Sequence, residues 1–158
     1  MTPTRSLMIF LGWLVLVMLA ALSGIATPPG EWYAGLAKPP LTPPNLAFPI
    51  AWSTLYLLMA LAAWRATLAA PPAARWHILW PFVAQLAANA LWSILFFGLH
   101  GMGLALLDLL LLWGLIVLTI RRFAGVSHLA AWLLVPYLAW VSFAAYLNVA
   151  TWWFNGGG

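Results

Sequence analysis

The sequence predicts an all-α integral membrane protein, a five-transmembrane-helix bundle whose long first loop acts as a lid. Of its 158 residues, 66% are hydrophobic and 5% are charged, whereas a soluble domain carries about a quarter charged residues. Five apolar runs nearly exhaust the chain, and each is close to the roughly 20 residues that cross a bilayer. We therefore expect one membrane domain over residues 1–158.

Proline, glycine and arginine mark the ends of the five expected helices, since proline cannot continue a helical hydrogen-bond ladder. The first run is longer than the apolar core of a signal peptide and no Ala-x-Ala site follows it, so it is expected to be retained. Pro136 falls inside the fifth run and predicts a kink. The expected spans are residues 6–26, 46–68, 76–98, 104–123 and 127–154.

The loop between the first two spans is rich in proline and aromatic residues. Because proline fixes φ, this loop is stiffer than its length suggests, and loops longer than about 15 residues are often functional. We expect residues 32–44 to form a lid, with Trp32, Tyr33 and Pro44 facing a ligand. Residues 52–56 would form the first wall beneath it.

The basic residues are distributed unequally between the two sides of the membrane. Lys38 alone falls on the side of the first loop. In a bacterial cell membrane this bias places the N-terminus in the cytoplasm and the C-terminus outside. The basic residues are too scattered for a nucleic-acid interface. Those on the side of the N-terminus are Arg5, Arg65, Arg75, Arg121 and Arg122.

The third span carries one polar and aromatic face. Gln85, Asn89, Trp92 and Phe96 are spaced by four, three and four residues, so they share one side of a helix. Amide side chains in hydrocarbon are costly unless they find partners. This face therefore points into the bundle, where the amides either hydrogen-bond neighbouring helices or line a ligand cavity.

Two further aromatic faces accompany it. Trp52 and Tyr56 share a face of the second span, although such a stripe alone is more often core or lipid-facing. Three faces together describe a pocket with flat apolar walls and few hydrogen-bonding points, which suits a large planar aromatic ligand. The face of the fifth span consists of Trp140, Phe143, Ala144 and Leu147.

Asp108 is the one carboxylate inside an expected span. It lies about one turn into the fourth helix, where the helix dipole favours a negative charge and where Lys38 is expected to pair with it. The alternative is a role in handling a ligand or a proton. The chain has no cysteine, and its three histidines share no ligand spacing, so no metal site is expected. One buried acid also leaves no arrangement for conventional hydrolytic chemistry.

Several motifs, distributed over all five spans in order, closely resemble the TspO/MBR family of tryptophan-rich sensory proteins and translocator proteins. The motifs are Trp32-Tyr33-Ala34-Gly35-Leu36-Ala37-Lys38-Pro39, Pro43-Pro44, Trp52-x-x-Leu55-Tyr56, Gln85-Leu86-x-x-Asn89-x-x-Trp92, Phe96-Phe97-Gly98, Ala105-Leu106-x-Asp108-Leu109-Leu110-Leu111, Pro136-Tyr137-Leu138-Ala139-Trp140 and Leu147-Asn148.

The resemblance implies a pocket beneath the first loop that binds porphyrins, haem-related tetrapyrroles and ligands of the benzodiazepine-receptor type. It implies no obligatory cofactor, and commonly a homodimer. The family's pocket residues fall on Tyr33, Trp52, Asn89, Trp140 and Ala144. From the residues themselves, a candidate dimer seam lies beside the polar face of the third span, at Ala84, Ala87 and Ala88.

The expected function is a membrane receptor, sensor or carrier for tetrapyrroles. One alternative is a light-dependent porphyrin-degrading enzyme, in which Trp52 and Trp140 would be redox partners of the excited ligand. Another is a sterol- or lipid-binding transporter. The family's proposed cholesterol motif is incomplete, because Val149 replaces the expected tyrosine and no Lys or Arg follows it. Such motifs are weak patterns in any case.

Overall fold

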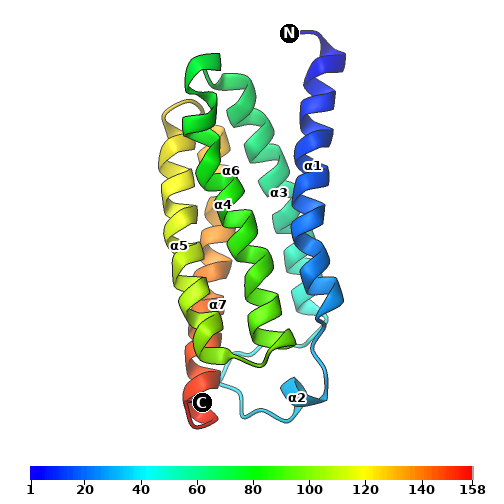
Figure 1. Ribbon diagram of the computed structural model, residues 1–158, viewed down its shortest axis with the longest axis vertical. Coiled ribbons are helices and arrows are strands. Elements are labelled where there is room, and N and C mark those ends of the chain that lie inside the picture. Colours follow the sequence, from blue (N-terminus) through cyan, green and yellow to red (C-terminus); the bar gives the residue numbers. More distant parts are fainter. Residues whose placement is uncertain (158) are drawn as a thin grey trace.

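The computed structural model describes residues 1–157 as a bundle of helices packed side by side (Figure 1). Within this part of the chain, five helical segments are long and apolar enough to cross a bilayer. The predicted five-helix membrane fold is therefore confirmed. The segments are Pro3–Ala26, Ala47–Ala69, Pro72–Gly98, Met102–Ala124 and His128–Phe154.

The first two spans, α1 (Pro3–Ala26) and α3 (Ala47–Ala69), pack against each other. Four alanines of α3 are completely buried, and such small side chains allow helix backbones to approach closely. A polar contact adds to this packing, because the indole N–H of Trp13 donates to Thr67 Oγ1 at 2.8 Å. The α1–α3 pair thus has a closely packed half, away from the first loop.

The third span is built from three pieces. A short 3₁₀ turn, η1 (Pro72–Ala74), leads into α4 (Arg75–Ser93), and a π-helical turn, η2 (Ile94–Gly98), ends it. The fourth span, α5 (Met102–Ala124), follows after a short turn and lies beside α4. π-Helical turns occur often at functional sites, and η2 contacts the first loop through the rings of Phe97 and Tyr33.

The fifth span consists of α6 (His128–Leu133) and α7 (Val135–Phe154), which are separated at Leu134. Pro136 is the second residue of α7, a position where its missing N–H is tolerated. The kink predicted at Pro136 corresponds to a break in the helix two residues earlier, at Leu134. Directly after Pro136, the Tyr137 side chain is buried at the centre of the bundle.

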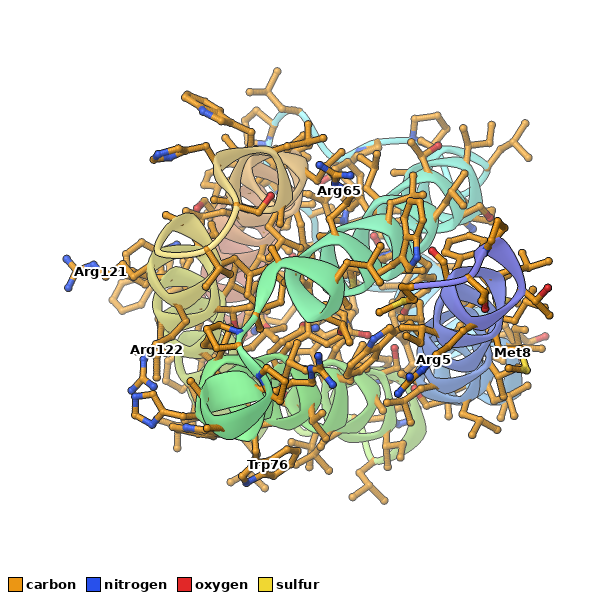
Figure 2. The ribbon with its side chains drawn as sticks, turned by 90° about the horizontal axis from the view of Figure 1, so that it is seen from above. Arg5, Met8, Arg65, Trp76, Arg121 and Arg122 are labelled. Carbon is orange, nitrogen blue, oxygen red and sulfur yellow. The ribbon has the colours of Figure 1, made fainter. Side chains whose placement is uncertain are left out.

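The two ends of the bundle differ, and the chain termini lie at opposite ends (Figure 1). At the lid end, the first loop with its short helix α2 (Glu31–Ala34) crosses the bundle. A small aromatic core at this end joins Tyr33 to Phe96, Met102 and Ala105. Figure 2 looks onto the opposite end, here called the arginine end. Figure 2 labels Arg5, Arg65, Arg121 and Arg122 at this end. Arg75 belongs to the same end, because it is the first residue of α4 and precedes Trp76.

Candidate functional site

A cavity of about 640 Å³ lies between α1, α3 and α4, on the lid side of the bundle. Prolines of the first loop and of the first turn of α3 contribute to its rim. The polar side chains along it are few and small or amide-bearing: Thr27, Asn45, Ser53, Asn89 and Ser93. The aromatic side chains along it are Phe48, Trp52, Tyr56, Trp92 and Phe97.

The aromatic rings form two flat walls. On α3, Trp52 stacks against Tyr56 with ring centroids 5.5 Å apart and planes 29° apart. On α4, Trp92 stacks on Phe96 at 5.2 Å and meets Phe97 edge to face at 5.7 Å. Rings that support one another in this way keep their orientation without a ligand. The cavity is therefore a preformed slot for a planar apolar group.

A buried hydrogen-bond chain runs behind the Trp52–Tyr56 wall and joins α3, α4 and α7. The Tyr56 hydroxyl donates to Asn89 Oδ1 at 2.9 Å, and Asn89 Nδ2 donates to the Tyr137 hydroxyl at 2.8 Å. The Tyr137 hydroxyl then donates to Gln85 Oε1 at 2.7 Å. Successive hydrogen bonds at low dielectric strengthen one another. Of the two alternatives for these amides, Gln85 shows interhelical bonding alone, whereas Asn89 does this and also lines the cavity.

A second polar link holds the α4 wall. The indole N–H of Trp92 donates to Asn148 Oδ1 at 3.0 Å, and Asn148 Nδ2 donates to the Met102 carbonyl at 2.9 Å. Asn148 is buried on α7. Trp92 is thus oriented from two neighbouring helices, and its ring edge is not free to rotate into the cavity.

The lid packs onto the cavity from above without lining it. Tyr33 is buried and meets Phe97 edge to face at 5.4 Å. This burial raises the pKa of the Tyr33 phenol, so the group stays neutral. Trp32 stacks on His100 with centroids 4.0 Å apart and planes 9° apart. Pro44 is exposed in the loop. The contact between the lid and the cavity lining is therefore indirect, because Tyr33 of the lid packs on Phe97, which lines the cavity.

The far end of α7 holds the lid by hydrogen bonds. Asn155 Oδ1 accepts from the Ala37 N–H at 3.1 Å, and Asn155 Nδ2 donates to the Ala37 carbonyl at 2.8 Å. The Tyr146 hydroxyl donates to the Pro40 carbonyl at 2.9 Å. Sequence reasoning did not identify Asn155, because a lone amide near a glycine-rich terminus carries no pattern.

The predicted pairing of Lys38 with Asp108 is wrong. The Lys38 ammonium donates to the carbonyls of Ala34 and Leu36, at 3.3 and 3.2 Å, and lies 4.6 Å from the Tyr33 ring centroid. Carbonyls at the end of α2 and an aromatic face satisfy the cation locally. Asp108 is buried on α5, and its Oδ2 has no hydrogen-bond partner among residues 1–157.

The predicted face of α7 lies away from the cavity. Trp140 contacts Trp52 edge to face at 6.4 Å. Trp140 and Phe143 line a second hollow, of about 480 Å³, between α3 and α7. Ala144 and Leu147 are half-buried on α7 and belong to neither lining. The two tryptophans expected to flank one ligand thus contact each other, with one hollow on each side.

Helix α1 forms a cavity wall that sequence reasoning missed. Its side chains there are Leu14, Met18, Ala21 and Ile25, spaced by four, three and four residues. This spacing was visible in the sequence. In a membrane helix, however, an apolar stripe facing a cavity cannot be distinguished from one facing lipid.

The fold and the cavity define a class: a small membrane protein of five helices with an aromatic cavity inside the bundle, beneath a proline-rich lid. The family model described as "TspO/MBR family" matches residues 10–154. The chain therefore belongs to the TspO/MBR family.

Similar proteins occur in bacteria and mammals. Protein CrtK of Rhodobacter capsulatus is 39% identical, over 96% of each chain. The tryptophan-rich sensory protein of Cereibacter sphaeroides is 39% identical, over 89% of this chain and 87% of its own. The translocator protein of Sus scrofa is 41% identical, over 80% of this chain and 76% of its own. These relatives agree with an integral membrane protein.

Proposed function

We propose that this protein is a membrane receptor or carrier that binds porphyrins and related tetrapyrroles in the cavity between α1, α3 and α4. Membership of the TspO/MBR family supports a membrane sensor or transporter role. The shape and chemistry of the cavity support the more specific proposal, that the ligands are tetrapyrroles.

The observation that carries the proposal is the pair of aromatic walls. Trp52 and Tyr56 on α3 and Trp92 on α4 border one cavity of about 640 Å³, within the range of about 300–1,000 Å³ typical of small-molecule sites. Flat rings and few polar atoms favour a large planar aromatic ligand. Asn89 is the buried polar group that would orient it.

Acidic substituents of such a ligand, for example porphyrin propionates, would lie at the rim of the cavity. The rim is at the lid end, and Lys38 is the one lysine or arginine at that end among residues 1–157. Its ammonium has three donors and is held by two carbonyls. Lys38 is the candidate partner for a carboxylate when the lid closes over a ligand.

Titration of the purified protein with protoporphyrin IX, followed by tryptophan fluorescence, tests the proposal. Replacement Trp52→Leu removes one aromatic wall and is expected to weaken binding about tenfold, or by roughly 1.4 kcal/mol. Trp153→Leu is the matched control, because Trp153 is exposed on the same lid side. Equal affinity of the Trp52 variant and the wild-type protein would contradict the site.

The variant Trp140→Leu locates the ligand more closely. If the porphyrin ring lies only in the cavity between α1, α3 and α4, this variant should bind it nearly as well as the wild-type protein does. The reason is that Trp140 lines the other hollow, between α3 and α7. A loss of affinity equal to that of Trp52→Leu would indicate that the ring contacts both tryptophans.

Illuminating the porphyrin complex distinguishes binding from porphyrin degradation. Degradation would generate a product with a new absorption spectrum, whereas binding alone would not.

We infer the membrane orientation from the arginine end. The excess of arginine there supports a cytoplasmic N-terminus and an outer C-terminus, if the host membrane is a bacterial cell membrane. A reporter that is active only outside the cytoplasm, fused to the C-terminus, should be active. Activity of a cytoplasm-only reporter at that position would reverse the assignment.

A homodimer stays a prediction. Of the three alanines suggested for its seam, Ala88 is buried within the chain, whereas Ala87 is exposed and Ala84 is half-buried. Any seam on α4 would therefore be centred on Ala87. Comparing the mass of the particle for Ala87→Trp and the wild-type protein in mild detergent tests this arrangement, and an unchanged dimer in the variant would exclude it.

A further inference from the structure

The charges of this protein are separated along the bundle. All five arginines belong to the arginine end, whereas Glu31 is in α2 and Asp108 is in the lid-side half of α5. The arginine end therefore has an uncompensated positive charge within the described residues. Such a concentration of one sign attracts anions to that end.

The corner where α4 begins and α5 ends has guanidinium groups with free donors. Arg122 Nη1 donates to the His77 carbonyl at 2.7 Å, which holds this side chain across the two helices. Arg121, the next residue, is exposed at the end of α5. Arg75 is half-buried at the start of α4, and its Nε is buried without a partner among residues 1–157. A guanidinium has five N–H donors, so most donors of this corner are unused.

The depth of this corner matches the lipid headgroups. Trp76 on α4 and Trp132 on α6 are 68% and 69% exposed, and Figure 2 shows Trp76 pointing outward from the bundle at this end. Exposed tryptophans near the ends of spans lie at the membrane–water interface. The arginines of the same end are therefore placed at the level of lipid phosphates.

An apolar strip leads from this corner toward the middle of the membrane. Leu107, Leu110, Leu111 and Gly114 are exposed on α5, and their spacing places them on the helix face that also carries Arg121. A side chain added at Gly114 would meet nothing within 4 Å, so the strip has a shallow notch. An acyl chain fits along such a strip, whereas a soluble phosphate compound makes no use of it.

We propose that the α4–α5 corner of the arginine end binds an anionic phospholipid, with Arg121 and Arg122 donating to its phosphate and the α5 strip contacting an acyl chain. Guanidinium groups match phosphate oxygens with paired hydrogen bonds. Basic pockets between membrane helices on the cytoplasmic side bind lipid headgroups in this way. The site is at the opposite end from the lid, so it is independent of the ligand cavity.

Lipid retention by the full-length protein tests the proposal. The protein is equilibrated in mixed micelles containing equal amounts of phosphatidylglycerol and phosphatidylcholine, and the retained lipids are quantified by mass spectrometry. The wild-type protein is expected to enrich phosphatidylglycerol. The double variant Arg121→Gln, Arg122→Gln should lower that enrichment about tenfold. Lys38→Gln, which removes a cation at the lid end, is the matched control and should retain it.

A second variant guards against a trivial loss of folding. Arg121→Lys, Arg122→Lys keeps both charges but loses the paired guanidinium donors, so it should restore part of the enrichment. Equal retention of the two lipids by the wild-type protein would overturn the proposal. The proposal would also be overturned if the glutamine variant enriched phosphatidylglycerol as much as the wild-type protein does. Loss of the enrichment in both the glutamine and the lysine variants would overturn it as well. Glycerol 3-phosphate, which lacks acyl chains, should not displace the lipid, and displacement would contradict the contribution of the α5 strip.

Discussion

The lid end and the arginine end of this bundle use their polar groups in opposite ways. At the lid end, Asn155 and Tyr146 bond the loop backbone, and Lys38 bonds carbonyls of its own segment. At the arginine end, the side chain of Arg121 is exposed, and Arg122 has one intramolecular contact. The lid end therefore uses its polar groups to hold the loop, whereas the arginine end leaves most of its guanidinium donors available to the surroundings. Substitutions should accordingly change stability at the lid end and lipid association at the arginine end.

The largest effect is expected where the polar network beneath the lid end passes through the core. Asn89→Leu leaves the hydroxyls of Tyr56 and Tyr137 without their amide partner, and should lower the free energy of unfolding by about 2 kcal/mol. Thermal unfolding in detergent measures this loss. Ser142→Ala removes an exposed contact with Trp113 and is the control, with about 0.5 kcal/mol or less expected. Equal losses of unfolding free energy in the two variants would show that the buried hydrogen-bond network contributes no more to stability than an exposed hydrogen bond.

A smaller and local effect is expected at the lid itself. Asn155→Ala removes both hydrogen bonds to Ala37, which should favour lid opening by about 1 kcal/mol, or roughly fivefold. Amide hydrogen exchange over residues 35–46 measures the opening. Asn155→Asp keeps the acceptor but not the donor and should be intermediate. The comparison between the ends would fail if Arg5→Gln, at the arginine end, changed this exchange as much.

The ring stack at the lid should contribute less. His100→Ala removes the partner of Trp32, whose ring lies 4.0 Å away, and the expected change in lid opening is about 0.5 kcal/mol, since such ring pairs contribute roughly 0.5–1.5 kcal/mol. The same exchange measurement applies. His128→Ala, an exposed histidine at the arginine end, is the control. An effect exceeding that of Asn155→Ala would make the stack, rather than the amide, the main contact of the lid.

The smallest effect is expected from the pair that the sequence suggested and the structure separates. In a double-mutant cycle of Lys38→Met and Asp108→Asn, the coupling free energy should be within about 0.5 kcal/mol of zero. Lys38 already has two carbonyl partners. Unfolding of the four proteins gives the coupling. A value above about 1 kcal/mol would restore the ion pair and would give the lid end a long-range charge contact.

Much of the site could be predicted because a membrane imposes simple rules on sequence. A polar amide in hydrocarbon must find a partner, so the helical spacing of Gln85, Asn89 and Trp92 predicted an inward face, and the structure places it there. Pro136 likewise predicted a distortion of the fifth span, which the structure shows as a break at Leu134, two residues before the proline. The sequence could not predict the partners of Lys38, because it does not say which carbonyl or carboxylate the end of a long flexible side chain will meet.

The sequence by itself determined the five spans, their order, the inward direction of the polar faces and the concentration of arginine at one end. Hydrophobicity, helical period and proline are local properties, and the bilayer leaves them few alternatives. Only the tertiary structure decided that α1 closes the cavity and that Trp52 and Trp140 face different hollows. The physical reason is that lipid, helix and ligand are equally apolar neighbours. An apolar stripe in the sequence therefore predicts contact with an apolar environment, and only the packing of the helices decides whether that environment is lipid, another helix or a ligand.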